Sequence, residues 1–441
     1  MAKNALGVAQ CLESDILTSK QLQLATGLGQ PAVSRQIGSL GDRVVKLPNG
    51  RSPKYALTRN AFGSGDKIPL FVVDADGNNT IAAYIRPLLI RGFFVELCPG
   101  GSPLLLGVNG SGVFDDLPYY IQGLRPQGFL GRQIVSELAA RSTTFPNDPI
   151  RWQTSHLGRY LIANGEDLPG NFQFGEAGLV RTRRAPTTYW RDDYPAIADA
   201  VLSGELAGSS AGGEQPKFTV YSEEKSSYVI VKFSPAGHEA DASRWRDILI
   251  TEYHATETLH AGSVAAANVK LVEKDDRLFL ESERFDRTGH YGRSSMISLQ
   301  MIDAEFVGDG ADWPTVMTRL ADKNLISSEH LQHARLLWEF GYLINNTDMH
   351  LGNMSLGMLD DKFNLLPSYD MCSMGFAPMR GLIKPLSFSP KGHSRLDCLS
   401  GNVPMYEKVR LLAMDFWERV ANDDRISGEF RKFLTQGNPI L

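Results

Sequence analysis

The chain has 441 residues, of which 42% are hydrophobic and 22% charged, and its formal net charge is −5. This length predicts two to four domains, and the composition is typical of a soluble globular protein. The four cysteines are far apart and form no C-x-x-C pair, which argues against a disulfide or zinc framework. The most apolar stretch, 81–106, is interrupted by arginines, Glu96 and Pro-Gly clusters and cannot span a bilayer, and no signal peptide is recognisable. We therefore expect a cytoplasmic protein without membrane contact.

The first 62 residues are basic, in contrast to the rest of the chain. They carry eight Lys/Arg and three Asp/Glu, which gives a net charge of +5. The remainder of the chain then has a net charge of −10. This difference indicates that the two parts have different partners. The pattern predicts a helix, a second helix at 20–25, a turn at 27–29, a third helix from Gln30, and a hairpin at 44–58 with an Asn-Gly turn. This order resembles a winged helix-turn-helix DNA-binding domain.

By that resemblance, double-stranded DNA is the partner of residues 1–62. The third helix would face the major groove, and the wing would lie near phosphate or the minor groove. The candidate contacts are Gln30, Ser34, Arg35, Gln36, Arg51 and Lys54. The alternative is a small helical interaction domain with solvated basic residues. A homodimer reading a palindrome would fit the first interpretation, although no residue pattern requires it.

The middle of the chain contains no recognisable chemical constellation. Residues 61–65 are a plausible linker, and 68–150 read as an α/β module that begins with short strands at 70–73 and 80–85. Residues 151–200 read as helices and loops, which we expect to open the next domain.

A loop of small residues at 208–217 precedes a predicted strand at 218–221. Small residues let backbone N–H groups approach phosphate oxygens, as a flap over a nucleotide requires. The loop matches neither G-x-x-x-x-G-K-[ST] nor the strict kinase G-x-G-x-x-G, and a flexible turn is the alternative.

The next strand, 228–233, contains a lysine in an apolar run. A buried lysine is costly unless it is paired, and the helix predicted at 242–260 offers a partner, since Glu252 lies within its apolar stripe. We expect a Lys232–Glu252 pair, with Lys232 reaching the α- and β-phosphates of a nucleotide. The alternative places Lys232 at an exposed strand edge and Glu252 on a solvated helix flank. The strand at 278–283 then leads into a linker where an adenine would meet backbone groups of Glu283, Arg284 and Phe285.

Three oxygen-bearing side chains follow in the order used by protein kinases. An apolar helical pattern at 331–344 ends at an Asn-Asn-Thr-Asp cluster, so Asp348 and Asn353 should lie on a loop. Two short strands around 360–362 then lead to Asp370. In kinases the first Asp orients the attacking hydroxyl, while the Asn and the second Asp hold Mg²⁺. A solvated polar loop with incidental acids is the alternative for the first motif alone.

These pieces together resemble the HipA family, bacterial serine/threonine kinases that act as toxins of toxin–antitoxin pairs. The matching segments are 209–217, Val231-Lys232, 251–253, 283–287, 346–353 and 367–370. The resemblance implies an α+β, protein-kinase-like two-lobed fold preceded by the winged helix domain. The domains would be 1–62, then 68–150, then a β-rich kinase N-lobe at 151–287 and a helical C-lobe at 288–441.

The resemblance also implies roles for residues in the site. Asp348 would be the catalytic base, Asn353 and Asp370 would bind Mg²⁺, and Ser209 or Ser210 would be an autophosphorylation site that silences the kinase. The implied ATP contacts are Ser210, Ala211, Gly212, Gly213, Lys232, Glu283, Arg284, Phe285, His350, Asn353 and Asp370. Protein hydroxyls would be the substrate, with aminoacyl-tRNA synthetases among the targets known for some members.

Two departures from the family pattern matter. The loop contains Glu214-Gln215-Pro216-Lys217 where members commonly have Gln-Glu-Lys, so the serine register is open. A DNA-binding domain is fused at the N-terminus, whereas the family usually relies on a separate antitoxin. The competing interpretation is therefore a transcriptional regulator whose kinase-like body senses nucleotide without transferring phosphate.

Overall fold

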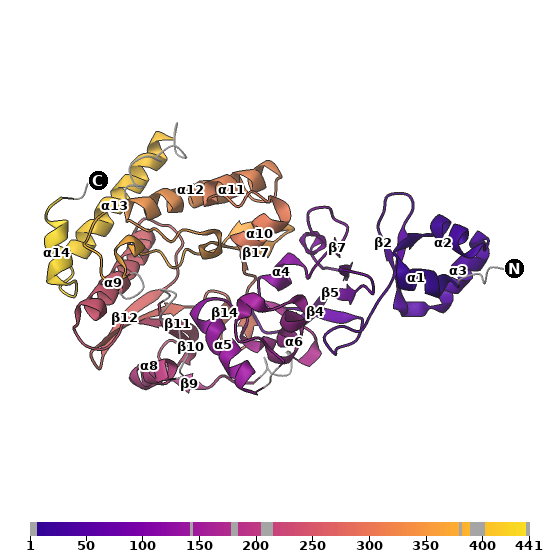
Figure 1. The fold of residues 1–441 in the computed structure, drawn as a ribbon. Coiled ribbons are helices and arrows are strands. Elements are labelled where there is room, and N and C mark those ends of the chain that lie inside the picture. The colour runs from indigo at the N-terminus through magenta and orange to yellow at the C-terminus, as the bar shows by residue number, and fades with distance from the viewer. Residues whose placement is uncertain are drawn as a thin grey trace. The chain divides into compact units, whose positions relative to one another are not determined.

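The computed structural model describes residues 7–141, 144–177, 184–203, 215–378, 382–388 and 402–437. The fold is mixed α+β (Figure 1). The chain divides into two compact units, the first made of 1–124 with 152–184 and the second of 125–151 with 185–441. In the described part of the chain, no helix is both long and apolar enough to cross a membrane.

The first unit begins with the three short helices and the hairpin expected from the sequence, and a further short strand, β1, completes a three-stranded antiparallel sheet. Their bounds are α1 (Val8–Ser14), β1 (Leu17–Thr18), α2 (Ser19–Thr26), α3 (Gln30–Ser39), β2 (Val44–Leu47) and β3 (Lys54–Leu57). Thr18 and Gln21 form a capping box at the start of α2, and Gly27 ends that helix with a left-handed φ of 72°. Val8, Leu12, Leu22 and Val33 are fully buried between the helices. We call residues 7–58 the N-terminal module.

The rest of the first unit is built on a five-stranded antiparallel sheet in the order β7-β6-β5-β4-β8. The bounds here are β4 (Ile68–Val73), β5 (Asn79–Pro87), β6 (Phe93–Leu97), β7 (Val113–Phe114), α4 (Tyr119–Gln122), α6 (Thr154–Asn164) and β8 (Phe172–Phe174). Because β8 pairs with β4, residues 152–184 complete this sheet. We had expected them to open the kinase N-lobe, and the structure divides the chain differently.

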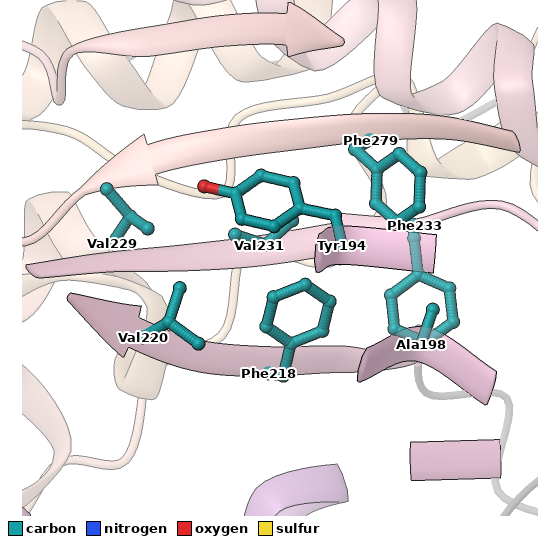
Figure 2. Packing of buried hydrophobic residues seen from close by; sticks show 8 residues of the cluster. All are labelled: Tyr194, Ala198, Phe218, Val220, Val229, Val231, Phe233 and Phe279. Atoms are coloured by element: carbon teal, nitrogen blue, oxygen red, sulfur yellow. The ribbon is translucent and has the colours of Figure 1, made fainter. Parts of the chain in front are cut away.

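The second unit contains another five-stranded sheet, in the order β12-β13-β11-β10-β9, with helices packed against it. The bounds are α5 (Gly128–Arg141), β9 (Thr188–Tyr189), α8 (Tyr194–Ser203), β10 (Lys217–Ser222), β11 (Ser227–Phe233), α9 (Ala240–Ala261), β12 (Val269–Lys274) and β13 (Arg277–Glu283). Alternate apolar side chains of β10, β11 and β13 meet Tyr194 and Ala198 of α8 in one core cluster (Figure 2). The Tyr194 hydroxyl donates to the buried carboxylate of Glu281 at 2.7 Å.

The remainder of the second unit is mainly helical. Its bounds are β14 (Arg287–Thr288), β15 (Gly292–Arg293), β16 (Ile297–Ser298), α10 (Leu299–Phe306), α11 (Trp313–Asp322), α12 (Ser328–Leu343), β17 (Ser355–Leu359), β18 (Lys362–Leu365), α13 (Val403–Asn422) and α14 (Gly428–Leu434). Ser327 caps α12, and Asn345 follows the helix with a φ of 59°. The helix therefore ends where the polar cluster of the sequence begins, and the hairpin β17–β18 confirms the two predicted strands.

The contact between Gly158 of α6 and Phe62 generates a testable prediction. A Cβ atom at Gly158 would lie 2.4 Å from ring atoms of Phe62, and that ring is held by Phe93 and Phe174 at centroid distances of 6.0 and 6.1 Å. Alanine normally stabilises a helix interior by about 0.5–1 kcal/mol relative to glycine. We expect Gly158→Ala to lower the free energy of unfolding instead, by about 1–3 kcal/mol, because the packed ring must move.

Urea unfolding of the full chain measures this difference, with Gly38→Ala as the matched control. Gly38 lies in α3, and a Cβ there meets nothing within 4 Å, so this substitution should be neutral or stabilising. An equal stabilisation by both substitutions would contradict the packing described here.

Candidate functional site

The site is centred on a buried lysine that contacts two carboxylates. Lys232 on β11 is only 6% exposed, and its Nζ lies 2.5 and 2.6 Å from the two carboxylate oxygens of Glu252 on α9. The same Nζ contacts Oδ1 of Asp370. Removing an ammonium group from water costs several kcal/mol unless opposite charges compensate, so these three groups depend on each other. The predicted Lys232–Glu252 pair is present, and Asp370 joins it from 138 residues away along the chain.

Helix α9 holds the Asp370 segment as well as the lysine. Thr251, next to Glu252, accepts a hydrogen bond from the Ser373 N–H at 3.2 Å and donates to the Ile248 carbonyl at 2.7 Å. Asp370 itself has a φ of 58°, in the left-handed region that Asp and Asn tolerate better than most residues. Helix α9 therefore positions both the Glu252 carboxylate, which pairs with Lys232, and the backbone that follows Asp370.

The electrostatics of the cluster favour an ionised Asp370. Burial alone would raise the pKa of Asp370, but the Lys232 and Lys217 ammonium groups outweigh it and hold that pKa at about 2. Burial alone would lower the pKa of Lys232, but Asp370 and Glu252 together raise it. For Glu252, burial dominates and raises the pKa, although Lys232 opposes this. The lysine and Asp370 thus form a stable charged pair at neutral pH.

A third potential metal ligand lies beside these two acids, but the trio does not suit a cation. One ligand atom each from Glu252, Asp370 and Cys372 lies within 4.8 Å of the others. Lys232 already supplies positive charge there, and burial raises the pKa of the Cys372 thiol well above its usual value. Mg²⁺ prefers oxygen ligands, so a protonated thiol and a carboxylate already held by the lysine make this trio a poor magnesium site.

The loop after α12 is held by backbone-directed hydrogen bonds. Asn346 accepts from the Asp348 N–H at 3.0 Å, and Nδ2 of Asn353 donates to the Asp348 carbonyl at 2.7 Å. Nδ1 of His350 accepts from the Gly352 N–H, and the indole of Trp313 donates to the His350 carbonyl at 2.9 Å. The carboxylate of Asp348 is about half exposed. It is therefore presented to solvent by a loop whose backbone is fixed.

The loop and the lysine cluster are neighbours. The Tyr369 hydroxyl, next to Asp370, donates to the Gly352 carbonyl at 3.1 Å, and Nδ2 of Asn346 donates to the Met371 sulfur at 3.8 Å. The segment that carries Asp370 is therefore bonded to the loop that carries Asp348 and His350.

The segment after β13 is more constrained than the sequence indicated. The N–H groups of Glu283 and Arg284 already donate to Asn268 and Tyr228 carbonyls, and the Arg284 guanidinium pairs with Asp286. An adenine would have to use other backbone groups there. The ring of Phe285 lies 5.8 Å from that of Tyr369, which precedes Asp370.

Other predicted residues lie outside this region. Ser209, Ser210, Ala211, Gly212 and Gly213 are outside the described residues. The six candidate DNA contacts are all exposed on the N-terminal module, but Oε1 of Gln36 accepts from the Val8 N–H at 3.1 Å. That bond ties α3 to α1, so Gln36 has a structural contact that the sequence did not reveal.

Sequence reasoning assigned no role to two residues that shape the site. Lys217 faces Lys232 across the β10–β11 pair and acts electrostatically on both Asp370 and Glu252. Trp313 anchors the His350 backbone from α11. The sequence did contain a signal for Lys217, because this residue lies at the start of the strand that follows the small-residue loop. Nothing local in the sequence links Trp313 to a loop 37 residues away.

Comparisons with known proteins give matches over most of the chain. Residues 64–183 match the family described as YjjJ-like toxin, middle domain, and residues 209–423 match the HipA-like C-terminal domain. Toxin YjjJ of Escherichia coli (strain K12) is 35% identical over 427 residues, which cover 94% of this chain and 92% of that protein.

Solved structures with a similar fold include a HipA structure. It is the Shewanella oneidensis MR-1 toxin–antitoxin complex of HipA, HipB and operator DNA. The match has a TM-score of 0.55 and 16% sequence identity, and it covers 82% of this chain and 90% of that chain. The Helicobacter pylori proinflammatory kinase CtkA matches more weakly, with a TM-score of 0.36 and 14% identity over 50% of this chain and 87% of that one. The HipA likeness shows that the two chains share a fold.

The depressed pKa of Asp370 predicts a pH-dependent contribution to stability. An Asp has a pKa of about 3.9 in an unfolded chain, and the native value here is about 2. Because the native value is the lower one, Asp370 stabilises the fold above about pH 4, and this contribution is lost as the pH falls toward 2. The stability difference between the parent and Asp370→Asn should be constant near neutral pH and shrink below about pH 4.

Denaturant unfolding at a series of pH values measures this difference. Asp361→Asn, at an exposed turn position, is the control and should show no comparable pH dependence. A parent–variant difference that grows on acidification would contradict the ion pair.

Proposed function

The chain belongs to the HipA-like toxin family, and from this premise we propose that it is an ATP- and Mg²⁺-dependent serine/threonine protein kinase. The observation that carries the proposal is the contact of buried Lys232 with both Glu252 and Asp370. A lysine held by a helix carboxylate beside an ionised aspartate is the arrangement that orients nucleotide phosphates in kinases. The family and the fold are consistent with it.

The residues present fit a magnesium nucleotide. Asp370 and Asn353 would hold Mg²⁺ through oxygen atoms, and the bound ion would neutralise charge on the phosphates. Lys232 would direct its ammonium group to the α- and β-phosphates while Glu252 keeps it in place. Lys217, on the neighbouring strand, would add positive charge on the same side of the sheet.

Asp348 would orient the acceptor. Its half-exposed carboxylate can accept the proton of a serine or threonine hydroxyl, while that oxygen attacks the γ-phosphorus and the bond to the β-phosphate oxygen breaks. ADP leaves, and the proton passes from Asp348 to solvent. The hydrogen bonds to Asn346, Asn353 and Trp313 would keep the loop in position during this transfer.

Phosphorylation of Ser209 or Ser210 would regulate the kinase. A phosphate adds about −1.5 to −2 charges, which would repel ATP phosphates from the loop. Comparing the mass of the purified chain with the masses of its Ser209→Ala and Ser210→Ala forms identifies the modified serine.

We further propose that the N-terminal module binds double-stranded DNA. Helices α2 and α3 are joined by a three-residue turn, and the side chains of Gln30, Ser34 and Arg35 are exposed on α3. Arg51 and Lys54 are exposed around the β2–β3 turn. Gln36 would position α3 through Val8 rather than read a base with its carbonyl oxygen.

The kinase proposal predicts that Asp348→Asn leaves the protein folded and reduces phosphoryl transfer by about 10²–10⁴-fold, because the acceptor hydroxyl loses its base. Transfer from γ-labelled ATP, together with phosphoproteomics after brief expression, measures the effect. Asp361→Asn is the matched control and should retain full activity. A parent protein that binds ATP but transfers no phosphate would reject the kinase and favour a nucleotide-sensing regulator.

The DNA proposal predicts that binding of the parent weakens steeply as salt rises, because Lys and Arg release counterions from phosphate. Arg35→Gln should weaken binding about tenfold. Arg91→Gln, an exposed arginine outside the module, should have no effect. Electrophoretic mobility shifts across a salt series measure both, and the absence of any shifted duplex in a genomic library would reject this assignment.

A further inference from the structure

An open depression of about 980 Å³ lies in the first unit, where the N-terminal module is joined to the following sheet. It is lined on one side by the connecting segment 59–63 and on the other by the start of α6. The volume is at the upper end of the range typical of small-molecule sites. None of the kinase candidates belongs to this unit, so the depression needs an explanation of its own.

Two arginines, one from each side, line the depression. Neither Arg59 nor Arg159 forms an ion pair with a carboxylate among the described residues. Arg86, in the same unit, is instead paired with both Asp66 and Glu96. Both arginines are exposed on this depression, and two like charges close to one concave surface create a positive potential that attracts anions.

Arg59 is already oriented by the fold. Its Nε donates to the Leu88 carbonyl at 3.1 Å, and its N–H donates to the Pro87 carbonyl at 2.9 Å. The remaining guanidinium nitrogens are the donors for a bound group. Asn60 accepts from the Gly65 N–H through Oδ1 at 3.0 Å, so its amide nitrogen is the remaining donor. By contrast, the Thr154 hydroxyl already donates a hydrogen bond to Oδ1 of Asp116 at 2.6 Å.

The two sides of the depression meet at Phe62. Phe62 has a φ of 63°, and its ring lies against Gly158 of α6, where no Cβ would fit. A non-glycine residue in this region of φ persists only when its surroundings hold it there. Segment 59–63 is therefore held against α6 at Phe62, between the two arginines.

We propose that this depression binds a small phosphorylated metabolite of nucleotide size, held by Arg59 and Arg159. Arginine guanidinium groups match phosphate oxygens in a bidentate geometry, and the amide of Asn60 adds a neutral donor. A polar, concave site of this size fits a compact anion better than a flat macromolecular surface. Because its occupant bridges α6 and the connecting segment, it would tighten the attachment of the N-terminal module.

That attachment already depends on a few named contacts. Arg86, which is buried, donates to the Asp42 carbonyl in the N-terminal module, and the Leu89 N–H donates to the Leu57 carbonyl at 2.7 Å. Thr58 and Leu88 form an isolated bridge between the module and the strand end. Arg59 follows Thr58 directly, so a ligand on Arg59 acts one residue from the module.

Calorimetric titration of the full chain in EDTA tests the proposal, with pyrophosphate, AMP and citrate as probes. We expect saturable binding of pyrophosphate or AMP, weakened at least about tenfold by Arg159→Gln and by Arg59→Gln. Arg91→Gln is the matched control and should bind within about twofold of the parent. EDTA removes Mg²⁺, and the arginine variants distinguish this site from any nucleotide bound in the second unit.

Any of three binding results would overturn the proposal. The first is the absence of saturable binding of either phosphate probe at millimolar concentration. The second is equal binding by the parent and both arginine variants, and the third is binding of citrate alone. Hydrogen exchange adds a readout that does not depend on activity. The peptide covering 58–64 should exchange more slowly with the probe bound in the parent and be unchanged in Arg159→Gln; no slowing in the saturated parent would also overturn it.

Discussion

The buried charge of Lys232 is the constraint on which the second unit depends. An ammonium group with 6% exposure needs compensating carboxylates, and the fold supplies two of them from separate elements. Helix α9 brings Glu252, and the chain after the β17–β18 hairpin brings Asp370. Because the same helix also binds the Ser373 backbone through Thr251, the sheet, the long helix and the hairpin meet at one point.

This arrangement explains how much of the site could be predicted from the sequence. Glu252 stood out because a carboxylate within an apolar helical stripe calls for a cation, and Lys232 stood out because it interrupts an apolar strand. Asp348, Asn353 and Asp370 were found by their order along the chain. Their convergence was inferred from resemblance, since spacing alone does not bring a residue at 232 to one at 370.

What could not be predicted depends on long-range packing. The pairing of β8 with β4 moves 152–184 into the first unit, although nothing local distinguishes that segment from the start of another domain. The bond from Gln36 to Val8 and the bond from Trp313 to His350 likewise join residues far apart in sequence. The depression between Arg59 and Arg159 belongs to the same class, because 100 residues separate its two charged walls.

The central claim is that the Lys232 cluster is built to receive a magnesium nucleotide. A crystal structure of the full chain with a non-hydrolysable ATP analogue and Mg²⁺ tests it most directly. The account predicts Nζ of Lys232 at hydrogen-bond distance from phosphate oxygens, with Asn353 and Asp370 as ligands of the metal. A nucleotide bound elsewhere, with Lys232 still enclosed by Glu252 and Asp370 and no metal at Asn353, would contradict it.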